Sequence, residues 1–170
     1  FEDYTPQVSV EPRISFNFPI SDQAMFFAHY DILTQRPQSA NRMNPYDYLF
    51  IAERASEIQN PNLKMEKTID YEVGFKQALT DHSALQISAF YKNLKDMVQL
   101  EQVAYAYPQV YTHFNNIDFG NVKGFSFNYE VRRAKNLSLN ANYTLQFADG
   151  TGSSASTAEN LIQAGFPNLR

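Results

Sequence analysis

The sequence contains no cysteine and no tryptophan, and its apolar residues form no long runs. Without cysteine, the 170-residue chain has no disulfide, zinc ribbon, iron–sulfur ligation or thiol catalysis. No purely apolar run is longer than the one from Ala24 to Ala28, which excludes a bundle of transmembrane helices. The chain begins at Phe1 without the charged and apolar regions of a signal peptide, so we expect a piece of a longer precursor with any export signal upstream.

Positive charge is also scarce. Lys and Arg number 14 against 18 Asp and Glu, so the net charge is -4 and the pI is about 5.3. The sequence has no basic stripe for a phosphate backbone, so we expect no nucleic acid partner. The three histidines, His29, His82 and His113, have no ligand spacing. We therefore expect neither a metal nor another cofactor.

Aromatic side chains, by contrast, are abundant. The chain has 14 Phe and 11 Tyr, yet its mean hydropathy is only -0.44, so many polar residues must lie between the aromatic ones. The alternation is clearest from Leu137 to Phe147, where apolar residues occupy every second position. A period of two residues is typical of strands, so the sequence predicts an all-β, antiparallel up-and-down meander.

Six segments show this alternation and are predicted as strands, at about 7–20, 23–33, 68–78, 84–92, 122–131 and 137–148. Met25, Phe27 and Phe90 interrupt the pattern. The links within each pair of strands are short, whereas long loops are predicted at about 34–67, 93–121 and 149–170. Strands of about ten residues with short turns at one end and long loops at the other are typical of outer-membrane barrels.

The alternation also assigns side chains to two faces. Exposing the apolar face to water would cost on the order of 1.5 to 3 kcal/mol for each large side chain, so we expect lipid to cover it. The Ser-, Asn- and Gln-rich polar face suits a wet or protein-filled lumen. The predicted lipid-facing residues are Ile69, Tyr71, Val73, Phe75, Leu85, Ile87, Tyr91, Phe125, Phe127, Tyr129, Leu139, Tyr143, Leu145 and Phe147. The predicted lumen-facing residues are Asp70, Glu72, Asn128, Glu130, Asn140, Asn142 and Gln146.

Several motifs resemble one family. The segment from Asn60 to Phe75 resembles the loop-to-strand signature of TonB-dependent outer-membrane receptors, in which Asn-x-x-Leu-x-x-Glu leads into a strand ending Glu-x-Gly-Phe. Leu85 to Val98, Asn121 to Phe127 and Leu139 to Ala148 resemble later strands of the family, in the same order. Ser126 stands where the family more often has Glu, so no role of that acid is carried over. The resemblance covers about residues 13–170.

The resemblance implies a 22-stranded barrel with an N-terminal plug in the bacterial outer membrane. Such a receptor is not an enzyme; it imports a scarce nutrient, such as an iron chelate, cobalamin or a glycan, with energy relayed by TonB. Its partners are its own plug domain, TonB and the outer-membrane lipid. This chain would be about six strands from the C-terminal part of the barrel, without plug or TonB box. Because six strands cannot close, the excised fragment is not transport-competent and is expected to self-associate.

Aromatic residues in the long loops are candidate ligand contacts. Asn44 as N-cap and Pro45 at the first helical position predict a short helix in the first long loop. Its tyrosines, Tyr46 and Tyr48, either contact ligand or belong to a helix packed over the barrel mouth. The second long loop holds Tyr105, Tyr107 and Tyr111, which form either a ligand-stacking surface or an aromatic girdle at the membrane interface.

Two other classes of protein remain open at this point. A soluble β-sandwich or lipocalin-like ligand-binding module would use the apolar face as its core. A glycan-active enzyme would need two of the separated acids Asp70, Glu72 and Glu130 to meet as a catalytic pair.

Overall fold

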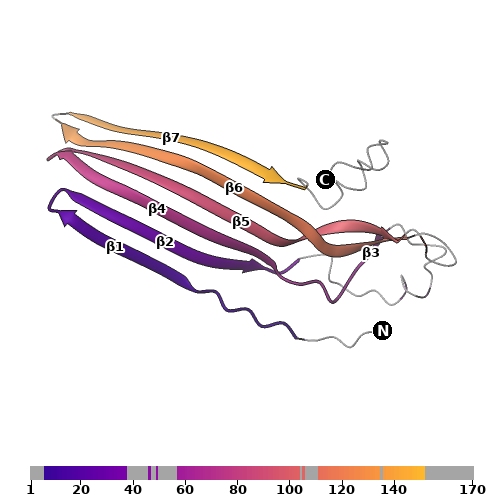
Figure 1. Cartoon of the computed structure of the whole chain (residues 1–170). Helices are drawn as coiled ribbons and strands as arrows, with labels where there is room; N and C mark the ends of the chain where they lie inside the picture. Colours follow the sequence, from indigo (N-terminus) through magenta and orange to yellow (C-terminus); the bar gives the residue numbers. More distant parts are fainter. Residues whose placement is uncertain are drawn as a thin grey trace.

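The computed structural model describes residues 6–37, 46, 49, 57–103, 105, 111–134 and 136–151, most of which lie in one sheet. Six long strands pair antiparallel in chain order (Figure 1): β1 (Arg13–Ser21), β2 (Ala24–Gln35), β4 (Glu66–Thr80), β5 (Ser83–Val103), β6 (Tyr111–Ala134) and β7 (Leu137–Gly150). The short β3 (Glu57–Ile58) runs parallel to β6. The predicted antiparallel meander of six long strands is confirmed.

The turns explain why neighbouring strands pair in sequence order. Residues 22–23 join β1 to β2 and residues 81–82 join β4 to β5, and both turns lie at the same end of the sheet (Figure 1). The end of β6 and the start of β7 also lie at that end. Thr80 and Ser83 share a hydroxyl hydrogen bond of 2.7 Å across the second turn. Because these connections are so short, each strand must fold back and pair antiparallel with the strand before it. At the other end of the sheet, which we call the loop end, β2 and β5 end and β4 and β6 begin.

Several predicted boundaries differ from the structure. The predicted loop at 93–121 is wrong over most of its length, because β5 continues to Val103 and β6 begins at Tyr111. Polar residues replace the alternation there, and irregular pairing between Leu94 and Val98 shifts the faces, so the period of two disappears although the backbone pairing continues. The first strand begins at Arg13 rather than at residue 7, after Pro12, which has no N–H to donate to a ladder. The predicted helix near Asn44 lies, apart from Tyr46 and Leu49, outside the described residues.

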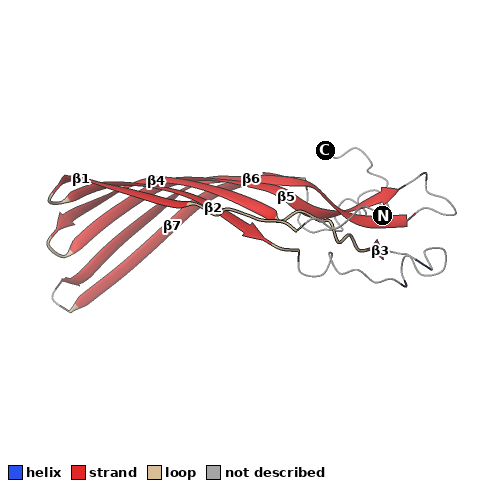
Figure 2. Ribbon diagram, turned by 90° about the horizontal axis from the view of Figure 1, so that it is seen from below, coloured by secondary structure: helices blue, strands red, loops and turns tan. Residues whose placement is uncertain are grey.

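The sheet is one curved layer (Figure 2). No large side chain among the described residues is completely buried, and the buried apolar residues are only Phe27, Ile58, Leu63 and Leu100. Phe16 is 56% exposed and Phe147 is 53% exposed, although both lie within regular strands. A β-sandwich needs a second sheet, and the described strands form one. The face that carries these apolar side chains therefore needs a covering that the described part of the chain does not supply.

No helix in the described part of the chain has the length and apolar character needed to cross a membrane.

Candidate functional site

The strand register gathers apolar side chains of all six long strands into rows on one face of the sheet. One row, from β1 to β7, consists of Phe18, Phe26, Phe75, Ile87, Phe127 and Tyr143. The next row consists of Phe16, Ala28, Val73, Ala89, Phe125 and Leu145. We call this face the outward face. Its apolar band runs along β7 from Leu137 to Phe147, about 33 Å of strand, which at a tilt near 45° spans about 23 Å and is close to the height of about 25 Å of the apolar band of a membrane barrel.

A row of tyrosines lies near the loop-end edge of this apolar band, with Ile32 and Ile69 in the next row beyond it. The rings of Tyr30 and Tyr71 lie 5.2 Å apart and those of Tyr71 and Tyr91 lie 6.3 Å apart, measured between centroids. The Tyr91 hydroxyl donates a 2.9 Å hydrogen bond to the amide oxygen of Asn121, which is paired in register with Asp149. Aromatic rings with polar tips at the edge of an apolar band are typical of the membrane–water interface.

All predicted lipid-facing residues lie on the outward face, and all predicted lumen-facing residues lie on the opposite, inward face, because strand residues alternate between faces. On the inward face Lys92 Nζ lies 2.8 Å from Asp70 Oδ2. The other oxygen of that carboxylate, Asp70 Oδ1, and the amide oxygen Asn128 Oδ1 are both buried, with no hydrogen-bond partner among the described residues. Buried polar atoms of this kind call for a partner against the inward face.

Two inward-facing phenylalanines cover glycines on the neighbouring strand. Phe27 is paired in register with Gly74, and Phe90 with Gly124. A Cβ on Gly74 would lie 2.6 Å from Phe27 Cε1, and a Cβ on Gly124 would lie 2.8 Å from Phe90 Cζ. Each ring therefore occupies the space that the missing side chain leaves, and Phe27 is only 6% exposed as a result. Sequence reasoning registered both residues only as interruptions of the alternation; the available signal was an aromatic residue on the polar face.

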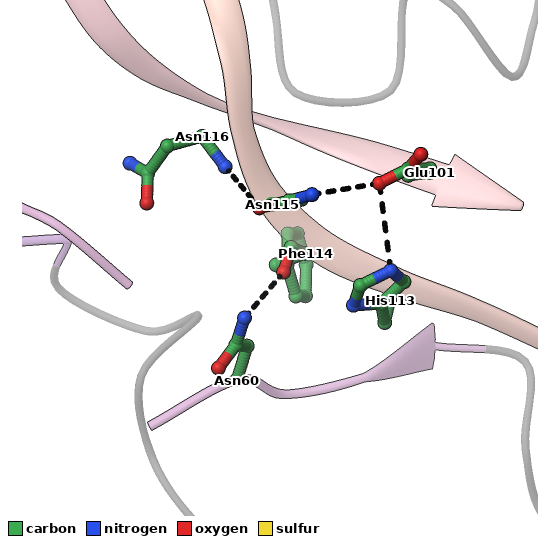
Figure 3. A network of polar contacts seen from close by, with 6 residues as sticks. All are labelled: Asn60, Glu101, His113, Phe114, Asn115 and Asn116. Atoms are coloured by element: carbon green, nitrogen blue, oxygen red, sulfur yellow. Dashed lines mark hydrogen bonds and ion pairs between the residues drawn. The ribbon is translucent and has the colours of Figure 1, made fainter. Parts of the chain in front are cut away.

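At the loop end, the segment 58–66 is fastened across the long β5–β6 hairpin. Asn60 accepts a 2.9 Å hydrogen bond from the Asn62 backbone N–H and donates one of 3.2 Å to the Phe114 carbonyl (Figure 3). Leu63 is buried, and Glu66 Oε1 accepts a 3.1 Å bond from the Val98 N–H. In this motif Asn60 therefore closes a turn and Leu63 anchors the segment by its burial. Glu66 accepts a hydrogen bond from the irregular part of β5.

The side chain of Asn116 holds this segment through both its amide oxygen and its amide nitrogen. Its Oδ1 accepts a 2.7 Å bond from the Lys64 N–H, and its Nδ2 donates to the Lys64 carbonyl at 3.1 Å and the Asp96 carbonyl at 2.6 Å. Asp96 lies at φ 56°, in the left-handed region that is uncommon for residues other than glycine. Asn116 therefore joins the incoming segment to the irregular point of β5.

The outer part of the β5–β6 hairpin carries further polar contacts. Glu101 Oε2 accepts a 2.7 Å bond from Asn115 Nδ2 and lies 3.6 Å from His113 Nε2 (Figure 3). Near the base of this region, burial raises the pKa of the Asp118 carboxyl, which the Phe119 backbone N–H lowers in part. Gln7 bridges the Leu63 carbonyl at 2.8 Å and the Met65 N–H at 3.1 Å. These bonds order the loop end without forming a metal site: the described residues include no group of three or more acids and histidines that holds a metal.

The predicted loop tyrosines do not come together among the described residues. Tyr46 is 63% exposed and Tyr105 is fully exposed. Tyr111 belongs to β6 rather than to a loop, and its ring lies 6.2 Å from that of His113. Tyr48 and Tyr107 lie outside the described residues.

These features define a class of protein. A single curved layer of tilted antiparallel strands in chain order, apolar on one face and polar on the other, with short turns at one end, is a segment of an up-and-down β-barrel.

The sequence matches the TonB dependent receptor-like β-barrel family over residues 2–167, so the chain belongs to that family. The predicted resemblance is confirmed.

Solved structures share the fold. The ferric enterobactin receptor PfeA of Pseudomonas aeruginosa, in a mutant form, aligns with a TM-score of 0.62 and 15% identity, covering 81% of this chain and 22% of that one. The outer membrane transporter YddB of Escherichia coli aligns with a TM-score of 0.61 and 15% identity, covering 84% of this chain and 20% of that one. FpvAI, in its complex with pyocin S2, aligns with a TM-score of 0.60 and 15% identity, covering 87% of this chain and 18% of that one. The chain thus spans about a fifth of these proteins. No curated protein matches the sequence.

Proposed function

We propose that these strands form part of the barrel wall of a receptor in the bacterial outer membrane that imports a scarce nutrient. The main support for the proposal is the set of continuous apolar rows across all six long strands, with the row of Tyr30, Tyr71 and Tyr91 near their loop-end edge. Lipid is the covering that suits such a face, because it leaves no apolar side chain in water. The loop end then lies on the extracellular side, where barrels of this kind carry their long loops.

The inward face supports the second part of the proposal, a plug domain filling the barrel. Asp70 Oδ1 and Asn128 Oδ1 need hydrogen-bond donors, and the exposed amides of Asn140, Asn142 and Gln146 extend the same polar surface. A plug of the kind that fills the lumen of 22-stranded transporters would offer such donors. TonB would act on that plug, and the isolated chain, with β1 and β7 as open edges, would self-associate and would not transport on its own.

A spin-label scan along β7 tests the placement in lipid. These 170 residues contain no cysteine, so in the complete receptor, with any cysteine elsewhere replaced, single cysteines at Asn142, Tyr143, Leu145 and Gln146 can each carry a nitroxide without background labelling. In lipid bilayers we expect the labels at 143 and 145 to be reached by oxygen at least several-fold better than those at 142 and 146, which a polar nickel complex should reach instead. Equal oxygen accessibility at all four positions would refute the lipid-facing assignment.

Uptake by cells tests the transport role. The resemblance to the family implies an iron chelate, cobalamin or a glycan as nutrient, so cells that produce the complete receptor should accumulate one radiolabelled member of this panel. Accumulation is expected to be saturable and to fall to background when TonB is deleted. Undiminished uptake without TonB, or no difference between cells with and without the receptor for any of the three classes, would contradict the proposal. Catalytic turnover of the nutrient is not expected, because the chain is proposed to be a receptor and not an enzyme.

A further inference from the structure

The β5–β6 hairpin consists of two regular parts joined by an irregular one. On the side of the turns, β5 pairs with β6 without a break from Ser83 to Leu94, and beyond the irregular part the pairing is regular again from Val98 to Val103. We call residues 98–103 and 111–116 the outer hairpin, and residues 95–97 and 117–119 the joint. In the joint the register shifts and then shifts back, and Met97 and Asp118 are the residues that still pair there.

The outer hairpin has fewer neighbouring strands than the rest of the sheet. The pairing of β4 with β5 ends at Lys95, and the pairing of β7 with β6 ends at Gly120. In the described part of the chain, the strand that accompanies the outer hairpin is β3, which pairs with residues 112–113. Ile58 of β3 and Leu100 of the outer hairpin are both buried. Three strands with buried apolar side chains can hold together, so the outer hairpin and β3 can move as one body about the joint.

Two features of the joint are typical of a hinge. Asp96 has a φ of 56°, a left-handed conformation that costs energy outside glycine and that occurs often in segments that switch. Beside the joint, a recess of about 260 Å³ opens on the inward face. Its lining includes Leu33, Gln35, Glu66, Thr68, Leu94 and Met97. Close packing resists displacement, so this space lets the outer hairpin turn inward, which would cover the 39% exposed Leu33.

Hydrogen bonds that cross the joint oppose this movement. Asn116 of the outer hairpin bonds to both the N–H and the carbonyl of Lys64, and it also donates to the Asp96 carbonyl. Glu66, the first residue of β4, accepts a hydrogen bond from the Val98 N–H. We call the contacts of Asn116 and Glu66 the brace. The brace ties the outer hairpin to the start of β4, which belongs to the regular part of the sheet.

We propose that the outer hairpin is a hinged arm that turns inward about the joint, and that the brace holds it in the outward position. The brace suits a releasable contact because its bonds are polar and Lys64 is exposed, so water can replace them when the arm turns. The inference depends on the strand pairing and not on the proposed placement in lipid. In the proposed receptor the arm would lie at the mouth of the lumen, where an inward turn narrows the entrance.

The distance between two spin labels tests the hinge. In the complete receptor, with any cysteine elsewhere replaced, one nitroxide is attached to Gln102→Cys on the arm and one to Lys76→Cys on the inward face of β4, both exposed positions. We expect one narrow distance while the brace is intact. The brace variant, Asn116→Ala plus Glu66→Ala, should add a second, shorter distance of comparable population. Glu66→Gln should keep the single distance, because its amide oxygen still accepts the Val98 N–H.

Hydrogen exchange separates a hinge from melting of the arm. In the brace variant the backbone amides of residues 99–102 should keep their exchange rates within about two-fold, because the arm moves as one body. The Val98 amide, which loses its acceptor, should exchange about ten-fold faster. Faster exchange throughout residues 99–102 would contradict the hinge, since it would mean that the brace only keeps the outer pairing formed.

The control removes one asparagine and one glutamate far from the joint. Asn140 accepts a hydrogen bond from Asn142, and Glu130 bonds to Arg132 near the turn end. Asn140→Ala plus Glu130→Ala should leave the single distance unchanged. A single distance in the brace variant, or a second distance of equal population in this control, would overturn the inference. Failure of the proposed function is distinguishable, because the β7 spin-label scan reports contact with lipid whatever position the arm takes.

Discussion

Replacing Gly124 by alanine is expected to lower the free energy of unfolding by about 3 kcal/mol, near the upper end of overpacking effects. A Cβ at this position would lie 3.0 Å from Gln146 Cα and 2.8 Å from Phe90 Cζ, and closer still to the Leu145 carbonyl oxygen. Two of these three atoms belong to the backbone of β7, so relief of the clash requires β6 and β7 to separate. Urea unfolding of the complete receptor in lipid bilayers, followed by circular dichroism, measures the loss.

Gly120 supplies the matched control on the same strand. Its added Cβ would meet the Asp149 carbonyl at 3.5 Å and Leu94 side-chain atoms at 3.9 Å, which are ordinary contacts. Gly120→Ala should therefore change the stability by less than about 1 kcal/mol, because alanine also costs less conformational entropy in a strand. A loss in Gly120→Ala as large as that in Gly124→Ala would show that the clash is not the cause.

The two phenylalanine–glycine pairs should differ in how far removal of the phenylalanine ring restores the stability lost when the glycine is replaced by alanine. The nearest atoms to a Cβ on Gly74 all belong to the Phe27 ring, so Gly74→Ala is expected to be relieved in part by Phe27→Ala. At Gly124 the backbone contacts remain when the Phe90 ring is removed, so the same double replacement should not restore stability. Double-mutant cycles on the two pairs measure this difference.

Arginine in place of Leu145 is expected to destabilise the complete receptor in bilayers by about 1 to 3 kcal/mol, because the cost of a charged side chain on the lipid face falls from about 2 to 4 kcal/mol at the midplane to about 0 to 1 kcal/mol near the interface. Leu145 is 43% exposed on the outward face and lies in the row of Phe16 and Phe125, one row inside the tyrosine row. The guanidinium there must either leave water or draw water and headgroups into the apolar band. The free energy of unfolding from bilayers is the measured quantity.

Gln146 provides the control one residue along β7. It is exposed on the inward face and pairs in register with Gly124, so its side chain points away from the apolar rows. Gln146→Arg should cost less than about 1 kcal/mol, since the inward face is polar. If both arginines cost the same, or if Leu145→Arg is neutral in bilayers, the outward face does not meet lipid.

Alternation in the sequence was enough to predict the strands and both faces wherever one face is apolar. From Leu137 to Phe147 every second residue is apolar, and the structure places each of them on the outward face. Beyond the tyrosine row this signal vanishes, because both faces of the β5–β6 hairpin carry polar residues and the pairing is irregular near Asp96. The predicted loop at 93–121 was wrong for this reason.

The roles of single residues could be assigned only once the structure gave the pairing register of the strands. Phe27 and Phe90 interrupted the pattern, and only pairing with Gly74 and Gly124 shows that they fill space on the inward face. The motif from Asn60 to Glu66 pointed to the family, but nothing in the sequence places its Lys64 against Asn116, 52 residues away. The sites proposed for ligand in the loops, around Tyr46 and Tyr105, stay predictions.

By itself the sequence determined which residues share a face, because consecutive side chains of a strand point to opposite sides whatever the strand packs against. It also determined the family, through motifs kept in order along the chain. Only the tertiary structure decided which residues of different strands stand side by side: the tyrosine row, the covered glycines and the contacts of Asn116 with Lys64. The physical reason is that a shift of register by two residues would preserve every face while changing every neighbour, so pairing is fixed by turns and contacts rather than by the pattern of any one strand.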